Sequence, residues 1–122
     1  MWIGKGDSDD IRKKWGGAGE PTINNTYCHK AGTPQYIKMG RIVQFNTDLL
    51  IAKQDIPVYT PFVSGLPRAK INTRIVGQVG IGQTTTGQTF GVNINGSISL
   101  YDGGPMPNGT YFYVSGTYIS EE

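Results

Sequence analysis

The chain has 122 residues, of which 18 are glycine, with 37% hydrophobic and only 16% charged side chains, a composition typical of a single turn-rich β domain. The net charge of +2 comes from 11 basic and 9 acidic residues without a long basic stripe, so nucleic acid is not an expected partner. No apolar run reaches the roughly 20 residues of a membrane helix, and the first residues lack a signal peptide's basic-then-apolar order, so no membrane insertion is expected.

Residues 1–21 differ in composition from the rest of the chain, because they carry eight of its twenty charged side chains, four of each sign. Acidic residues at 9–10 precede basic residues at 12–14, which suits the dipole of a helix of one or two turns that ends before Gly16. We therefore predict an N-terminal connector over residues 1–21 and a head domain over residues 22–122.

Strand signals recur from Thr22 onward, and helix signals are absent there. Residues 58–67 are flanked or interrupted by three prolines, which predicts an edge strand or an irregular connection. A two-residue Asn95-Gly96 turn is expected to join two alternating runs. Seven to nine short strands predict an all-β fold, an antiparallel sandwich or barrel resembling a jelly-roll head. The expected strand regions are 22–29, 35–39, 41–47, 48–57 with a turn near 53–54, 72–81, 89–94, 97–101 and 110–119.

The last predicted strand is rich in aromatic residues. Since successive side chains point to opposite faces, Phe112 and Val114 are expected in the core while Tyr111 and Tyr113 point outward. Tyrosine suits interfaces because it combines a large contact area with a hydroxyl group. Tyr111 and Tyr113 are therefore candidate oligomer-interface residues, and a solvent-facing tyrosine ladder is the alternative.

A glycine-rich stretch at residues 82–89 resembles a phosphate-binding loop in spacing. The position of the essential lysine is held by Gln88, and a strand follows where a helix would be required, so a nucleotide site is not expected. A hairpin loop whose Thr and Gln side chains suit sugars or a neighbouring subunit is the preferred interpretation.

Cys28 and His29 are the only thiol and the only imidazole of the chain. Neighbouring residues of an extended segment point apart, so they are not expected to form a catalytic pair, and one histidine is too little for a metal site. We predict no metal and no cofactor, with Cys28 structural. The three N-x-[ST] sequons could be glycosylation sites, but turns are the preferred interpretation, since two of the three are Asn-Gly pairs.

The carboxylates of the β region leave one enzymatic alternative open. Glycoside hydrolysis needs two facing carboxyl groups roughly 5 to 10 Å apart, and the sequence allows Asp48 or Asp55 to face Asp102. Single aspartates beside turns are more often turn formers, so no catalytic residue is assigned.

The order of features from Tyr36 to the end resembles the C-terminal head domain of receptor-binding proteins on the tails or baseplates of siphophages that infect Gram-positive bacteria. Residues 2–15 are also similar to linker segments of phage tail proteins. The segments that carry the resemblance are 36–45, Leu66-Pro67-Arg68, 72–77, 92–96 followed by a strand, and 115–119.

The resemblance implies a homotrimeric, non-catalytic adhesion domain at the tail tip of a virion, which binds saccharides of the host cell wall outside the cell alongside other tail proteins. In such heads the sugar lies near a protomer junction, against an aromatic ring and between polar side chains. Carried onto this chain, that makes Phe90 the candidate stacking ring, with Gln88, Asn93 and Arg74 as hydrogen-bonding partners. The rival readings are a structural tail or baseplate module without a ligand, and a polysaccharide depolymerase.

Overall fold

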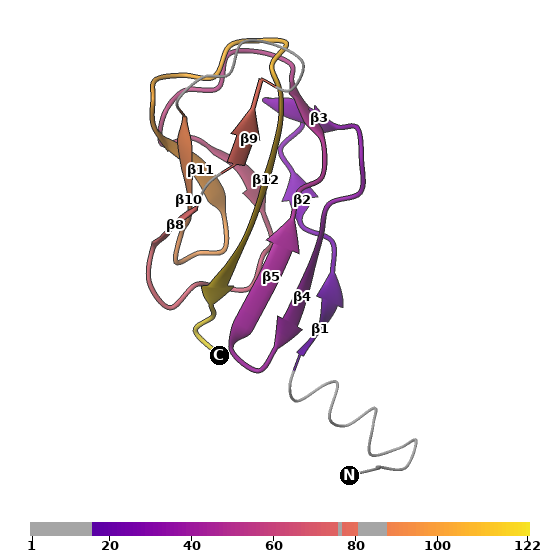
Figure 1. The fold of residues 1–122 in the computed structure, drawn as a ribbon, viewed down its shortest axis with the longest axis vertical. Helices are drawn as coiled ribbons and strands as arrows, with labels where there is room; N and C mark the ends of the chain where they lie inside the picture. The colour runs from indigo at the N-terminus through magenta and orange to yellow at the C-terminus, as the bar shows by residue number, and fades with distance from the viewer. Residues whose placement is uncertain (1–15, 76, 81–87) are drawn as a thin grey trace.

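The computed structural model describes residues 16–75, 77–80 and 88–122, and these form twelve strands and no helix (Figure 1). The short helix expected within residues 8–14 and most of the 82–89 loop lie outside the described residues. The strands are β1 (Gly16–Gly19), β2 (Thr22–Ile23), β3 (Cys28–Lys30), β4 (Gln35–Met39), β5 (Ile42–Asn46), β6 (Leu50–Ala52), β7 (Pro61–Ser64), β8 (Thr73–Ile75), β9 (Gly77–Val79), β10 (Thr89–Val92), β11 (Ile98–Asp102) and β12 (Tyr111–Ile119).

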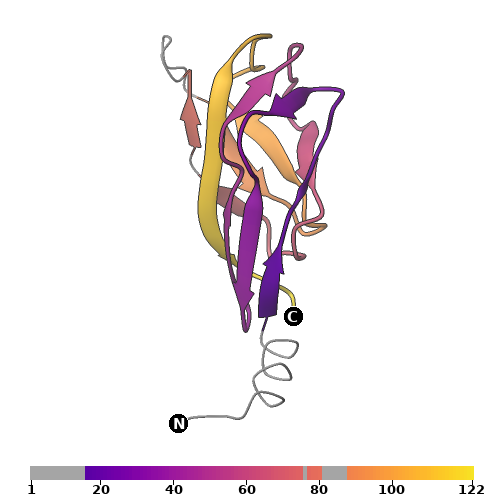
Figure 2. The same cartoon turned by 90° about the vertical axis from the view of Figure 1, so that its right-hand side faces the viewer.

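Two antiparallel sheets pack together as a β-sandwich, which confirms the predicted fold class (Figures 1 and 2). The seven-stranded sheet has the order β1-β4-β5-β12-β6-β3, with β9 also paired to β12. The five-stranded sheet has the order β2-β7-β11-β10-β8. β12 runs the length of the first sheet, pairing with β5 along one half and with β6 and β9 along the other.

The predicted faces of β12 are confirmed. Phe112 and Val114 are fully buried, whereas Tyr111 and Tyr113 are 41% and 39% exposed on the outer face of the seven-stranded sheet. The period of two in this strand therefore separates core from surface without exception over its central residues.

Three phenylalanines form the centre of the core. The ring of Phe62 on β7 meets the rings of Phe90 and Phe112 edge-on, with centroids 5.8 and 5.5 Å apart. Phe90 and Phe112 lie parallel at 6.2 Å, so strands of both sheets are joined through this cluster. Such ring pairs contribute about 0.5–1.5 kcal/mol each beyond the area that they bury.

The predicted boundary at residue 21 is wrong, because β1 lies within the expected connector and pairs with β4. A Cβ added at Gly19 would lie 2.6 Å from the ring of Tyr36, so this position must be glycine for the ring to pack across the strand. In the sequence, the glycine run resembles a flexible linker. Glycine is also found in strands where a neighbouring side chain approaches the backbone closely, and that is its role here.

Two local predictions also need correction. β7 lies between β2 and β11 and is not an edge strand; Pro61 is tolerated as its first residue. The β10–β11 hairpin exists, but its loop is longer than two residues: the amide of Gly96 donates to Asn93 O at 2.9 Å, and the amide of Asn93 donates to Ser97 O at 2.8 Å. Gly96 alone adopts positive φ in that loop, as in three-residue hairpins that end in a glycine bulge.

Candidate functional site

The structure contradicts the assignment of Phe90 as a stacking ring for a sugar. Its side chain is fully buried between Phe62 and Phe112, so no face of the ring is open to a ligand. The reason is the register of β10, which pairs Phe90 with the buried residues Leu100 and Ile75 on the inner face of the sheet.

Gln88 is also turned into the protein. Its side chain is buried, and its Nε2 donates to Pro105 O at 3.2 Å, which ties the start of β10 to the loop after β11. The structure therefore gives Gln88 a role in holding that loop and does not bring it to a ligand-accessible surface beside Asn93.

Arg74 and Asn93 do come together, on the outer face of the five-stranded sheet and around a residue that the sequence assignment left out. The hydroxyl of Tyr101 on β11 donates to Asn93 Oδ1, and Arg74 Cζ on β8 lies 4.3 Å from the Tyr101 ring centroid. Asn93 Nδ2 is held in turn by the hydroxyls of Ser97 and Ser99, each at 2.9 Å. The tyrosine ring is thus fixed at its hydroxyl end and covered on one side by the guanidinium.

A glycine creates the seat for this ring. A Cβ at Gly91 would overlap the Tyr101 ring, so the absence of a side chain lets the ring lie against the backbone of β10. Glycine within a strand can mark a close approach, but the approaching side chain comes from the neighbouring strand β11, and the sequence alone does not identify it.

Tyr59 adds a second ring to the same surface. It is 69% exposed, its centroid lies 5.7 Å from that of Tyr101, and the two rings meet at 71°. Its backbone has φ of 64°, a left-handed conformation that costs non-glycine residues of the order of 1 kcal/mol, while its amide donates to Leu100 O at 2.6 Å. A strained backbone that holds a large apolar ring in solvent is a recognised mark of a functional position.

A hollow of about 330 Å³ adjoins the rings and is lined by Arg74, Ile75, Thr89 and Asp102. Arg74 Nη1 donates to Asp102 Oδ2 at 2.9 Å, and Thr89 Oγ1 donates to the same oxygen at 3.3 Å. Both charged side chains are largely exposed, so the pair adds little stability and keeps its remaining donors and acceptors available. We call Tyr59, Arg74, Thr89, Asn93, Tyr101 and Asp102 together the Tyr101 surface.

Cys28 is structural, as predicted. It is fully buried, and this burial raises the pKa of its thiol to about 12, although Lys53 acts weakly in the opposite direction. The thiol therefore stays protonated at neutral pH, and only the thiolate is a good nucleophile. His29 is exposed on the other face of β3.

The aspartates of the depolymerase alternative are occupied in turns. Asp48 accepts from the amides of Thr33 and Leu49 at 3.0 and 2.9 Å, and Asp55 accepts from the amide of Asn108 at 2.8 Å. Asp102 is paired with Arg74. The contacts of Asp48 and Asp55 are those of turn-forming carboxylates, whereas Asp102 ends β11 and forms an ion pair.

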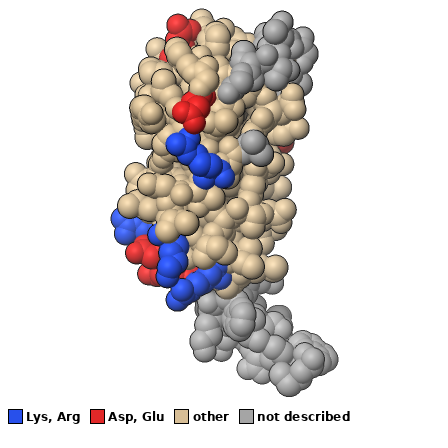
Figure 3. All heavy atoms as spheres, turned by 60° about the vertical axis from the view of Figure 1, so that its left-hand side comes forward, with Lys and Arg blue, Asp and Glu red and all other residues tan. Residues whose placement is uncertain are grey.

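Charged side chains are sparse over much of the face seen in Figure 3, where Lys and Arg gather toward the lower end of the domain. Among the described residues, no group of three or more His, Cys, Asp or Glu side chains is placed to hold a metal ion. Residues 16–75, 77–80 and 88–122 also include no helix long and apolar enough to cross a membrane.

Comparison with protein-family models, with curated proteins and with solved structures finds no match for this chain.

Proposed function

We propose that this chain is a non-catalytic adhesion domain of a siphophage tail tip, which recognises a saccharide of the host cell wall through the Tyr101 surface. The observation that carries the proposal is the exposed Tyr59 ring, held by strained backbone beside Tyr101 and the Arg74–Asp102 pair. The resemblance of residues 36–122 to phage tail heads supplies the biological setting.

The chemistry of the Tyr101 surface suits a sugar. A pyranose ring has apolar C–H faces that pack on tyrosine, and hydroxyl groups at its edge that pair with carboxylate, guanidinium and hydroxyl groups. A small exposed sugar makes few contacts, so each site is expected to be weak. Several copies on one virion convert weak contacts into firm attachment through a high effective concentration.

A binding role is preferred to a depolymerase because of where the carboxylates lie. Hydrolysis of a glycosidic bond needs two carboxyl groups that face one substrate. Asp48 and Asp55 accept backbone hydrogen bonds in turns of their own, and Asp102 is paired with the guanidinium of Arg74. Release of reducing ends from wall polysaccharide, lost in Asp102→Asn, is the result that would favour the enzyme.

Tyr59→Asn should weaken adsorption to host cell walls by about three- to tenfold per site, since it removes one aromatic contact of about 1 kcal/mol. Asparagine tolerates left-handed backbone, and this gain should roughly offset the loss of the Tyr59–Tyr101 ring contact, so the free energy of unfolding should change by about 1 kcal/mol or less. Arg74→Ala should weaken adsorption as well, whereas Lys70→Ala removes an exposed charge outside the surface and should leave it unchanged. The measurement is a glycan array together with adsorption to cell-wall preparations. Failure of the unaltered protein to bind any of these preparations would refute the proposal.

We also propose that the domain works as a homotrimer in which Tyr111 and Tyr113 contact a neighbouring protomer. Tyr113→Ala should then lower the solution mass from trimer toward monomer at micromolar concentration, because a central tyrosine typically contributes about 2 kcal/mol or more to an interface. Sedimentation equilibrium gives the mass, and Tyr59→Asn, at an exposed tyrosine of the β6–β7 connection, is the control that should keep the trimer. A monomeric unaltered protein would refute this assembly.

A structural tail or baseplate module is the second candidate, and one observation favours it. The outer face of the seven-stranded sheet exposes four large aliphatic side chains, 47–69% accessible, and three of them are paired across strands beside the β4–β5 turn, which suits contact with other virion proteins. They are Ile37, Met39, Ile42 and Ile119. A trimer that binds no wall preparation would select this function.

A further inference from the structure

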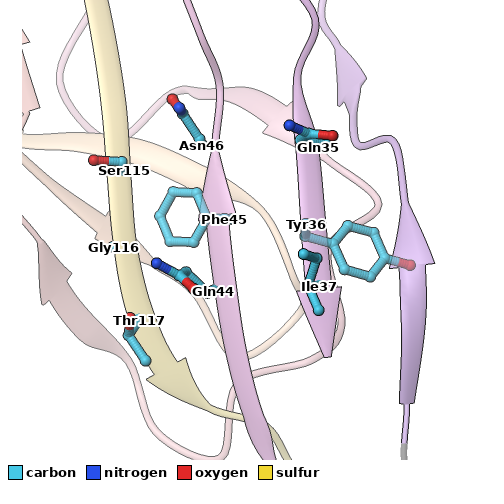
Figure 4. A pocket seen from close by; sticks show the side chains of 9 residues that line it. All are labelled: Gln35, Tyr36, Ile37, Gln44, Phe45, Asn46, Ser115, Gly116 and Thr117. Carbon is cyan, nitrogen blue, oxygen red and sulfur yellow. The ribbon is translucent and has the colours of Figure 1, made fainter. Parts of the chain in front are cut away.

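A shallow trough lies on the outer face of the seven-stranded sheet, across β4, β5 and β12 (Figure 4). One wall is a rung of outward side chains in register, Ser115, Asn46 and Gln35. The other wall is the next outward rung, Thr117, Gln44 and Ile37.

The floor of the trough is the rung between these walls. Gly116, Phe45 and Tyr36 are paired across the three strands, and the side chains of Phe45 and Tyr36 turn toward the interior, so backbone forms the surface. Outward rungs are two residues apart, about 7 Å, and three strands span about 10 Å. The hollow of about 350 Å³ is therefore long enough for roughly two pyranose rings laid across the strands.

The walls carry side-chain amides and hydroxyls, and most of them make no hydrogen bond within the described residues. Asn46 Oδ1 accepts from the amide of Asp48 at 2.8 Å. Within the described part of the chain, the exposed side chains of Gln35, Gln44, Ser115 and Thr117 have no hydrogen-bond partner. Side-chain amides present a donor and an acceptor side by side, which matches neighbouring hydroxyls of a sugar.

The same lining argues against other ligands. No Lys, Arg, Asp or Glu lines the trough, so nothing there compensates a charged ligand. Ile37 is its one outward aliphatic side chain, which is too little apolar surface for a lipid. A peptide strand finds no free backbone to pair with, because β5 is already paired on both sides by β4 and β12.

We propose that this amide trough is a second binding site, for a neutral oligosaccharide of two or more pyranose units. The trough and the Tyr101 surface lie on opposite sheets of the sandwich, so this site does not depend on the proposed function of the Tyr101 surface.

The test is an NMR titration of amide chemical shifts with cellotetraose, laminaritetraose and maltotetraose at about 10 mM, a concentration suited to weak sugar binding. At least one of these neutral probes should shift the amides of residues 35–37, 44–46 and 115–117, while trigalacturonic acid should not. Gln44→Leu keeps the side-chain volume but deletes the amide, and should weaken binding about two- to tenfold.

Gln78→Leu is the matched control, because Gln78 is another exposed glutamine of the same sheet that does not line the trough, and it should leave the affinity unchanged. Tyr59→Asn should also leave trough binding intact, which separates this site from the Tyr101 surface. The proposal is overturned if no neutral probe shifts these amides, if Gln44→Leu and Gln78→Leu behave alike, or if Gln44→Leu lowers only the solution mass, which would assign the trough to contact between copies.

Discussion

Phe112→Ala should lower the free energy of unfolding by about 3–5 kcal/mol, the usual cost of removing a fully buried phenylalanine. Phe112 is fully buried and packs against Phe62 and Phe90, so its loss leaves a cavity at the junction of the two sheets. A domain of this size typically has only about 5–15 kcal/mol of stability in total, so a large fraction is lost.

The neighbouring Tyr113→Ala is the control for this experiment. Tyr113 lies on the opposite face of β12 and is 39% exposed, so its removal should cost the monomer about 1 kcal/mol or less. Urea denaturation of both variants, below the concentration at which copies associate, gives the comparison. Similar losses for the two variants would show that the alternation of β12 does not separate core from surface in solution.

Gly96→Ala should be much more damaging than Gly109→Ala, although both glycines end an Asn-Gly pair and both have positive φ, 82° and 85°. Left-handed backbone alone costs an alanine about 1–2 kcal/mol, and this is all that is expected at Gly109, where a Cβ meets no atom within 4 Å. At Gly96 the Cβ would overlap the carbonyl oxygen of Leu66, whose own amide donates to Gly96 O at 3.1 Å.

The overlap forces the hairpin and the β7–β8 connection apart, so the total loss at Gly96 should reach about 3 kcal/mol or more. Thermal and urea unfolding of the two variants measure the difference. Equal losses would mean that the left-handed backbone alone accounts for the lost stability, and that Leu66 can move away from the added Cβ without a free-energy cost.

The buried position of Phe90 shows where the prediction from sequence failed. Phe90 lies in β10 and Asn93 directly follows this strand, three residues later, so alternation alone assigns them to opposite faces, and this signal was present in the sequence. Tyr101 is the ring that lies on the same face as Asn93 and contacts it. Its partner Arg74 is 27 residues away, and the pairing of β8 with β10 and of β10 with β11 brings the two together.

The glycine-rich segment at 16–19 shows the converse. Glycine marks a flexible linker, a turn or a close approach, and these uses are alike in a sequence. The pairing of this segment with β4, together with the packing of Tyr36 against Gly19, identifies it as β1 and extends the domain beyond the predicted boundary.

The sequence by itself determined the all-β class, most of the strands, the β10–β11 hairpin and the two faces of β12, because these depend on local alternation and on turn residues. Tertiary structure alone decided which strands are neighbours. For that reason it also decided the two surfaces that we propose as saccharide-binding sites. Strand order brings Arg74, Tyr101 and Asp102 together, and the amide trough exists only because the outward side chains of β4, β5 and β12 are aligned in register. Strand order and register are set by long-range packing, which no local pattern of residues encodes.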